Sequence, residues 1–249
     1  MKVLRYEKKK NGMYQVFFDN GNDIDLSEEI ILKYNLLIKK EASSSLIDKM
    51  LDENKVYIGY NLAIKYITTK MRSKKEIREH LKKKEIDNDS INEIIDILIK
   101  EKYIDDDSYA KAYVNDKILL TNDGPNKIRN SLEDLGINSK SINGTLELFD
   151  PSIQEEKIDK VIKKLINTNR TKSGYLLKNK ILTYLSNLGY DRSIVNKVIN
   201  NYEFKTDKDI EKKEYEKIYN RLSRKYSGDE LKLKVRQKMY ALGFNNYEE

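Results

Sequence analysis

The sequence predicts a mainly α-helical protein: a tandem array of three-helix repeats in a curved solenoid, with a small N-terminal β-hairpin or meander. The composition favours helices, because the 249 residues include only 2 prolines and 10 glycines, with 39% hydrophobic and 36% charged residues. Apolar residues recur at helical spacing after the N-terminal segment. One helical pattern also returns four times at nearly constant intervals, which indicates internal repeats.

The N-terminal segment has the residue types and turn signals of β-structure. Val3–Tyr6 and Tyr14–Phe18 have strand character, and Ile24–Leu26 is a candidate third strand. Asn11-Gly12 and Asn20-Gly21 lie between these segments, and Asn-Gly is a strong hairpin signal. We therefore expect a small hairpin or meander here.

Three helices are expected between these strands and the first clear repeat pattern. Glu28–Tyr34 is a short helix, and Leu46–Glu53 is a second helix that is capped near Ser43–Ser45. A third helix through Tyr57–Ile67 leads into the stretch around which the rest of the chain is organised.

Residues Met71–Tyr109 give the clearest pattern in the chain. Ser73 with Glu76 three residues later is a capping box, so a basic helix begins there. The acidic cluster Asp105–Asp107 is expected to cap a later helix. Between them, five apolar residues at i, i+3, i+4, i+7 and i+8 predict a core helix: Ile91, Ile94, Ile95, Leu98 and Ile99.

The pattern of the basic helix recurs along the chain. Its first apolar residue has counterparts at intervals of 51, 53 and 54 residues: Ile77, Ile128, Ile181 and Val235. Three copies end in a glycine that suits the left-handed backbone of a helix C-cap: Gly136, Gly189 and Gly243. Each copy is preceded by a helix candidate and the first three are followed by one, which predicts repeats of three helices.

The predicted organisation has five parts. Residues 1–54 form the N-terminal β-hairpin and short helices, and residues 205–249 form a partial fourth repeat. Between them lie repeat 1 (55–105), repeat 2 (106–151) and repeat 3 (152–204). We call the helix that carries the recurring pattern the middle helix of its repeat.

Motifs for catalysis find little support in the sequence. The absence of cysteine excludes disulfides and thiolate metal sites, and it fits a reducing compartment. His80 is the single histidine, so a metal site around it lacks further ligands. Asp105–Asp107 is explained by helix capping, and Gly124-Pro125 lacks the rest of a phosphate-binding loop. We expect a non-enzymatic protein with no metal or other cofactor.

The hydropathy and charge of the chain bear on its location and partners. No apolar run approaches the length of a membrane span, and the N-terminus MKVLRYEKKK has no apolar signal segment. These features favour a cytoplasmic protein without a membrane partner. The net charge of +7 is compatible with a solvated lysine-rich surface or with an acidic partner.

Basic residues occupy equivalent positions on the middle helices. The residue after the first apolar position is leucine in repeat 3 (Leu182) and arginine in the other copies: Arg78, Arg129 and Arg236. Lysines stand one or three positions before the apolar residue in most copies: Lys74, Lys127, Lys178, Lys180, Lys232 and Lys234. The basic face around the first middle helix adds Arg72, Lys75 and Lys82. We call these twelve residues the cationic set, and we expect them to bind a protein partner or nucleic acid.

Two interpretations of the cationic set compete. A solvated helix face is the simpler explanation for the lysines. The arginines favour a binding role, because a guanidinium group offers two parallel hydrogen bonds to phosphate or carboxylate. Cations that recur along a solenoid form a stripe suited to a phosphate backbone or to an acidic protein groove.

Tyrosine is abundant, with 18 tyrosines and no tryptophan. Tyr103, Tyr109 and Tyr113 recur at helical or boundary spacing. We expect them to pack in or near the core rather than to stack on nucleic-acid bases.

Three segments of the chain carry a family resemblance: LKKKEI at 81–86, YIDDDSYAKAYV at 103–114 and GPNKIRNSLEDLGI at 124–137. They resemble the RecX regulatory proteins, the bacterial modulators of the RecA recombinase. The resemblance covers most of the chain, and the N-terminal hairpin with three-helix repeats is similar to the longer members. Glu85 and Lys102 stand where the family pattern has glycine, and Gly144 is expected to interrupt the last helix of repeat 2.

The resemblance implies a regulator that binds the RecA filament on single-stranded DNA, with double-stranded DNA as a further partner. It implies inhibition of strand exchange, ATP hydrolysis or coprotease activity, and we expect a monomer. The alternative is a direct DNA-binding regulator with helix-turn-helix-like units. The helices after the basic ones are acidic or apolar rather than rich in Asn, Gln and Arg, which disfavours that alternative. A helical adaptor without a nucleic-acid role is a third interpretation.

Overall fold

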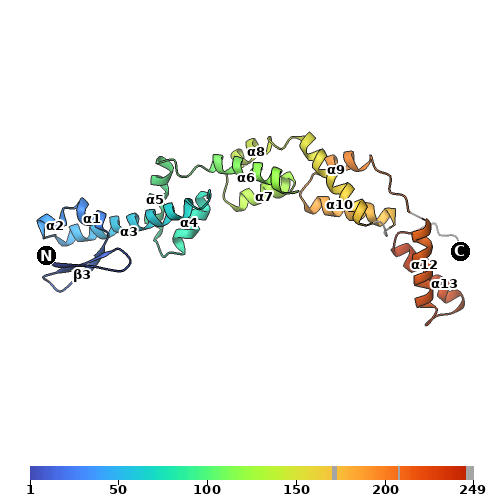
Figure 1. The fold of residues 1–249 in the computed structure, drawn as a ribbon, viewed down its shortest axis with the longest axis horizontal. Helices are drawn as coiled ribbons and strands as arrows, with labels where there is room; N and C mark the ends of the chain where they lie inside the picture. The colour runs from blue at the N-terminus through green and yellow to red at the C-terminus, as the bar shows by residue number, and fades with distance from the viewer. Residues whose placement is uncertain (170–172, 207, 245–249) are drawn as a thin grey trace. The chain divides into compact units, whose positions relative to one another are not determined.

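The structure is a computed structural model that describes residues 1–169, 173–206 and 208–244 (Figure 1). Within these ranges it contains 13 α-helices and one three-stranded antiparallel sheet, which confirms the predicted mainly helical fold. None of the helices in these ranges combines the length and the apolar character that a membrane span requires. The chain divides into two compact units: Met1–Tyr109 with Leu135–Ile137, and Ala110–Asp134 with Asn138–Glu249.

The N-terminal sheet is a meander in which β1 (Val3–Lys8), β2 (Tyr14–Phe18) and β3 (Asp23–Leu26) pair in chain order. All three predicted strands are therefore confirmed. The central strand β2 turns alternate residues, Val16 and Phe18, into the core of this part of the chain. The sheet and the short helices that follow it lie at the N-terminal end of α3 (Figure 1).

Two short helices and one long helix follow the sheet: α1 (Glu28–Lys33), α2 (Leu36–Lys39) and α3 (Ser44–Ile67). α2 was not predicted, and α3 is continuous where the sequence predicted two helices. The expected break holds no proline or glycine, and Asn54 within it is buried. The Asn54 amide accepts from the backbone N–H of Ser27 at 2.8 Å and donates to the carbonyl of Asp25 at 3.1 Å. This polar residue therefore fixes α3 to the end of β3 instead of ending the helix.

In repeat 1, the second half of α3 packs against α4 (Lys74–Lys82) and α5 (Asn88–Lys100). The predicted capping box is confirmed: the Ser73 hydroxyl accepts from the N–H of Glu76 at 3.2 Å, and the Glu76 carboxylate accepts from the N–H of Ser73 at 2.9 Å. The predicted core stripe of α5 is buried except for Ile99, which is 38% exposed. Ile99 lies in the last turn, at the edge of the stripe.

The remaining helices are, in chain order, α6 (Asp106–Leu120), α7 (Pro125–Asp134), α8 (Ser139–Leu146), α9 (Pro151–Thr168), α10 (Gly174–Asn187), α11 (Arg192–Ile199), α12 (Lys208–Leu222) and α13 (Gly228–Ala241). The residue ranges assigned to the repeats stay a prediction. α8 runs through Gly144, so the expected interruption is wrong. Asn138 caps this helix through the N–H of Ser141 at 3.0 Å, and buried Ile142 anchors it, which together outweigh the low helix propensity of glycine.

The glycines predicted as helix C-caps have positive φ, which confirms the prediction: 78° at Gly136, 86° at Gly189 and 76° at Gly243. Glu85 and Lys102, which stand in place of glycine, also have positive φ, of 62° and 63°. The turn geometry is thus kept without glycine at these two places, at a cost of about 1–2 kcal/mol each.

The turn after α10 also forms the contact with the preceding repeat. The N–H of Gly124 donates to the carbonyl of Leu188 at 2.6 Å, and the N–H of Asn126 donates to the carbonyl of Gly189 at 3.0 Å. A Cβ atom on Gly189 would lie only 2.4 Å from the backbone nitrogen of Lys127. The start of α7 therefore rests directly on the glycine turn that ends α10.

The same contact recurs at the other two glycine turns. The hydroxyl of Ser173, at the start of α10, donates to the carbonyl of Leu242 at 2.6 Å, and a Cβ on Gly243 would lie 2.6 Å from that hydroxyl oxygen. A Cβ on Gly136 would lie 3.2 Å from Cβ of Lys75, near the start of α4. The start of each of these middle helices thus meets the turn that ends the next one, and we call this contact the repeat junction.

The three tyrosines singled out in the sequence do not share one environment. Tyr109 is buried and Tyr113 is half-buried, as expected, whereas Tyr103 is 53% exposed. The prediction is therefore wrong for Tyr103. After the left-handed turn at Lys102, the buried position is taken by Ile104 instead.

Candidate nucleic-acid and protein interface

The middle helices α4, α7, α10 and α13 each turn one apolar side into the core. In α4 this side consists of Ile77 and Leu81, and the equivalent residues of the other three helices are also buried. A residue next to a buried one lies about 100° around the helix, so it falls on a flank. All twelve members of the cationic set are accordingly exposed or half-buried.

Arg78 and Arg129 are held in the same way. Nη1 of Arg78 donates to Oδ1 of Asn92 at 2.8 Å, and Nη1 of Arg129 donates to Oδ1 of Asn143 at 2.7 Å. In both cases the asparagine stands 14 residues after the arginine, on the third helix of the repeat. Both arginines are half-buried, so the bond fixes each guanidinium group at the flank of its middle helix. We call each pair an arginine–asparagine clamp.

A clamp orients the guanidinium group without neutralising it. The amide oxygen accepts one N–H and carries no charge, so the full positive charge and further donors remain for a ligand. Because each guanidinium group is half-buried, the effective dielectric constant around it is lower than in bulk water, and its attraction for an anion is stronger. The clamps are therefore suited to bind anionic oxygen atoms of phosphate or carboxylate.

Arg72 has a different environment, because it is largely occupied within repeat 1. Its guanidinium group lies 3.8 Å from the centre of the Tyr66 ring, and its Nη1 is 3.4 Å from the carboxylate of Glu76. Its side chain is 13% exposed. The nearby carboxylate offsets its charge, so Arg72 contributes less to an outward-facing cationic surface than Arg78 does.

Lys127 is also paired within the protein. Its ammonium group lies 2.7 Å from the carboxylate of Asp123, which also receives a hydrogen bond from Lys117 at 2.8 Å. Burial alone would raise the pKa of Asp123, but the hydrogen bonds from these two lysines outweigh burial and lower the pKa. Asp123 is therefore ionised, and it partly offsets the charge of Lys127.

The other lysines and Arg236 differ in how closely their charged groups contact the rest of the protein. The ammonium group of Lys74 lies 4.0 Å from Asp106, that of Lys180 donates to Asn169, and that of Lys234 lies 6.0 Å from the ring of Tyr226. The stem of Lys75 lies beside Gly136 in the repeat junction. The remaining members are exposed except for half-buried Lys178: Lys82, Lys178, Lys232 and Arg236.

The acidic cluster and the single histidine have structural roles. Asp105 caps α6, because its carboxylate accepts from the N–H of Asp107 at 3.0 Å and from the hydroxyl of Ser108 at 2.6 Å. Asp106 accepts from the N–H of Lys74 at 3.0 Å, at the start of α4. Among the described residues, no group of three or more His, Cys, Asp or Glu side chains could hold a metal ion.

His80 stacks on Tyr66, with ring centres 4.0 Å apart and planes 3° from parallel. Burial lowers the pKa of His80, and the positive charges of Lys84 and Arg72 add to this effect. The imidazole is therefore neutral near pH 7 and packs against the ring that also contacts Arg72.

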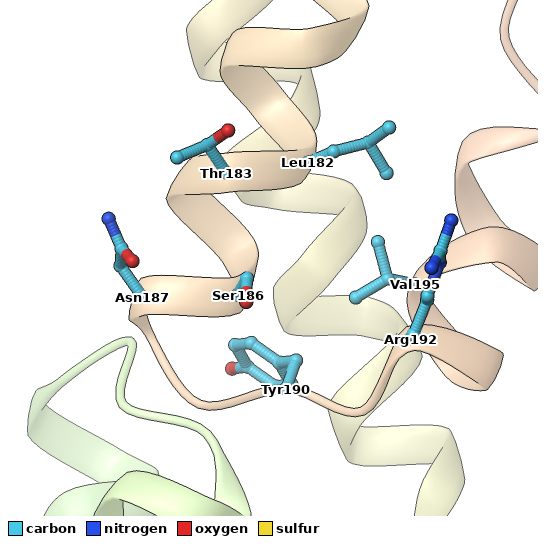
Figure 2. Close-up of a pocket in the computed structure, with 7 residues that line it drawn as sticks. All are labelled: Leu182, Thr183, Ser186, Asn187, Tyr190, Arg192 and Val195. Carbon is cyan, nitrogen blue, oxygen red and sulfur yellow. The ribbon is translucent and has the colours of Figure 1, made fainter.

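Repeat 3 lacks the clamp. Leu182 takes the position of the arginine, although Asn196 stands 14 residues later, as in repeats 1 and 2. Leu182 lines a hollow of about 360 Å³ between α10 and α11. Figure 2 shows Leu182 on the side of α10 that faces Val195 and Arg192.

Tyr190 lies at the base of this hollow, where α10 ends (Figure 2). It is 5% exposed and packs edge-on against Phe149, with ring centres 6.3 Å apart. Its hydroxyl has no hydrogen-bond partner within the part of the chain that the structure describes. Burial raises the pKa of Tyr190 to about 12, and the charge of Asp123 adds to this effect.

Asn92 and Asn143 were not among the site residues predicted from the sequence. The signal that would have found them is the constant offset of 14 residues from an arginine, which is visible twice in the sequence, with Asn196 as a third asparagine in register. This offset joins the middle helix to the third helix of the same repeat, so it becomes meaningful only when the two helices are known to pack against each other.

The sequence is similar to known proteins over nearly its whole length. A family model described as "RecX, first three-helix domain" matches residues 60–98. The chain is 34% identical to the regulatory protein RecX of Lactococcus lactis subsp. lactis over 251 residues, which cover 96% of this chain and 92% of that protein. It is 29% identical to the regulatory protein RecX of Oceanobacillus iheyensis, over 96% of this chain and 91% of that protein.

Solved structures show the same fold. A crystal structure of regulatory protein RecX matches 80% of this chain and 98% of its own, with a TM-score of 0.67 and 24% identity. The crystal structure of RecX from Lactobacillus salivarius matches 60% of this chain and 97% of its own, with a TM-score of 0.57 and 30% identity. The similarity to the Lactococcus lactis protein covers nearly the full length of both sequences. The chain therefore belongs to the RecX family of regulatory proteins.

Proposed function

We propose that this protein is a non-enzymatic regulator that binds the RecA recombinase filament on single-stranded DNA and inhibits its recombinase, ATPase and coprotease activities. The family relationship supports a regulatory role. The observation that carries the proposal is the recurrence of the arginine–asparagine clamp, which presents a guanidinium group bonded to a neutral amide at the same position of two successive repeats. A filament is itself a repeating polyanion, because it contains a continuous DNA strand.

The histidine and the acidic cluster that were considered as candidate catalytic groups have structural roles, which favours a binding protein over an enzyme. His80 stacks on an aromatic ring, and Asp105 and Asp106 hold helix starts. The exposed members of the cationic set add affinity by releasing counterions from DNA, and they do so without reading bases. We therefore expect binding that falls with salt and depends little on sequence. Strong preference for one duplex sequence would favour the alternative of a sequence-reading DNA-binding protein.

The test is the DNA-dependent ATPase activity of RecA, measured with increasing amounts of this protein. Wild type is expected to depress the rate. A test variant replaces by glutamate the three arginines that follow the first apolar residue of a middle helix: Arg78, Arg129 and Arg236. It is expected to lose the inhibition, because three cations become anions that repel an acidic partner. A matched control reverses three exposed lysines outside the cationic set: Lys100, Lys111 and Lys163.

The control separates position from net charge, because both variants change the charge equally. Circular dichroism melting of both variants checks that the helices remain folded, which matters for half-buried Arg78 and Arg129. If the control loses inhibition as fully as the test variant does, only net charge matters and the assigned surface is wrong. If the test variant inhibits as wild type does, the partner is bound by another surface.

A further inference from the structure

Two residues outside the cationic set are bonded to two of its four arginines. Asn92 and Asn143 lie on α5 and α8, and each accepts a hydrogen bond from the guanidinium group of its clamp on the middle helix. Both asparagines are exposed, so neither is needed to fill the core. Hydrogen bonds of 2.8 and 2.7 Å at the same offset of 14 residues in two repeats indicate a common role for the two asparagines.

We infer that Asn92 and Asn143 are positioning residues that orient Arg78 and Arg129 to bind phosphodiester groups of nucleic acid. This inference rests on the proposed function, and it adds which side chains prepare the site and which repeats contain it. A free arginine side chain has many rotamers and loses them when it binds. A clamp restricts them in advance, so less entropy is lost when a phosphate arrives.

The surroundings of Arg78 favour a phosphodiester chain over a single carboxylate. Lys74 stands four residues before Arg78 and Lys82 stands four residues after it, so the three cations share one face of α4. They extend over about 12 Å of helix, at about 1.5 Å per residue. Lys82 is exposed, and Lys74 is only loosely paired at 4.0 Å. A row of positive charges of this length matches a polyanion rather than one acidic side chain.

Repeat 3 contains only the asparagine of the arginine–asparagine clamp. Asn196 is present at the offset of 14 residues, but Leu182 replaces the arginine. A cation nevertheless lies nearby, because Arg192 lines the hollow beside Leu182 (Figure 2). The equivalent position, ten residues after the arginine, holds Ser139 in repeat 2. Repeats 1 and 2 are therefore the phosphate-binding modules, and repeat 3 lacks only the arginine at the helix flank.

The first test removes the clamp and keeps the arginine. The affinity of the full-length protein for a fluorescein-labelled oligodeoxythymidine is measured by anisotropy over a series of salt concentrations. Asn92→Ala with Asn143→Ala is expected to weaken binding about tenfold at fixed salt, on the scale of immobilising two side chains. The slope of log affinity against log salt should stay unchanged, because no charge is lost. Melting of the variant reports whether the fold is kept.

Two further double variants show what happens when the charge of the arginines is removed or neutralised. Arg78→Ala with Arg129→Ala should weaken binding and also reduce the salt slope by about 1.4, at about 0.7 per phosphate contact on single strands. Asn92→Asp with Asn143→Asp keeps an acceptor for the guanidinium group but neutralises it, so its slope should fall by a similar amount. Among these variants, only Asn92→Ala with Asn143→Ala should weaken binding while the slope of log affinity against log salt stays unchanged.

The second test builds a clamp where none exists. Leu182→Arg with Arg192→Ser reproduces the pattern of repeat 2 beside the resident Asn196, and it leaves the net charge unchanged. We expect binding to oligodeoxythymidine to become about two- to tenfold tighter, on the scale of one preorganised side chain. Adding Asn196→Ala to this variant should remove the gain.

The outcomes distinguish this inference from the proposed function. If the arginine variants bind oligodeoxythymidine as wild type does, the flank does not contact nucleic acid and both proposals fail in their DNA contact. If the arginine variants lose affinity while the asparagine variants match wild type, the positioning role alone is overturned. A gain in repeat 3 that survives Asn196→Ala would overturn it equally.

Discussion

Gly189→Ala is the sharpest test of how the repeats are joined. Gly189 has a φ of 86°, and a Cβ there would lie 2.4 Å from the backbone nitrogen and 2.7 Å from Cβ of Lys127. The substitution therefore combines an unfavourable backbone conformation with a collision at the repeat junction. Backbone atoms cannot rotate away as the end of a flexible side chain can, so the two repeats must separate.

The expected loss of stability has two parts. A left-handed backbone costs a residue with a Cβ about 1–2 kcal/mol. Separating the repeats removes the bonds from the N–H of Gly124 to Leu188 and from the N–H of Asn126 to Gly189, at 2.6 and 3.0 Å. At about 0.5–1.5 kcal/mol for each hydrogen bond, the total loss is about 2–5 kcal/mol.

The assay is urea denaturation of the full-length protein, combined with hydrogen exchange of peptides from α7 and α10. Gly12→Ala is the matched control, since Gly12 also has a φ of 86° but no atom lies within 4 Å of its Cβ position. Gly228→Ala is a second control in the same compact unit as Gly189, with a φ of 55° and equally open space. Both controls should lose only the backbone part, about 1–2 kcal/mol.

A common result for all three variants would refute the reasoning. If Gly189→Ala costs no more than Gly12→Ala, the close contact at the junction contributes nothing to stability. If exchange accelerates only in the last turn of α10 and not at the start of α7, the turn is strained but the repeats stay joined.

Further measurements test the core and the buried hydroxyl. Leu98→Ala removes a fully buried side chain of repeat 1, and it should lower stability by about 2–5 kcal/mol, with faster hydrogen exchange confined mainly to that repeat and its neighbours. Tyr190→Phe removes a buried hydroxyl that is unpaired among the described residues, and it should raise the free energy of unfolding by about 1 kcal/mol or leave it unchanged in urea denaturation. Folding raises the pKa of Tyr190 from 10.0 to about 12, so between pH 10 and 12 the folded state holds a proton that the unfolded state has lost. The free energy of unfolding should therefore decline as the pH rises through this range. The decline should be smaller in Tyr190→Phe, and equal slopes in the two proteins would contradict the assignment.

The fold was predictable from sequence where the signals are local. The strands end at Asn-Gly turns, Ser73 and Glu76 form a capping box within four residues, and glycine marks each positive φ after three middle helices. Such signals depend on the backbone next to them, so they survive without knowledge of the tertiary structure.

The missed features depend on contacts that are distant in sequence. Asn54 appeared to be a loop residue, but it lies inside α3 because its partners, Ser27 and Asp25, are nearly thirty residues away. The cationic set was assigned from position alone, which does not reveal that Glu76 offsets Arg72 or that Asp123 offsets Lys127. Charge counts along a helix cannot distinguish a cation that is paired within the protein from one that remains available.

The repeat junction has a direction. The start of a middle helix meets the turn that ends the following one, as Lys127 meets Gly189 and Ser173 meets Gly243. An internal repeat therefore has two different ends, and a duplicated copy inserted between repeats would find a complementary surface on both sides. The turn that ends α4 differs, because Glu85 keeps the left-handed backbone but carries a side chain where the later turns have none. Duplication of an internal repeat is thus compatible with the junctions on both of its sides, whereas at the turn that ends α4 the side chain of Glu85 would stand where the later turns leave little room for a Cβ.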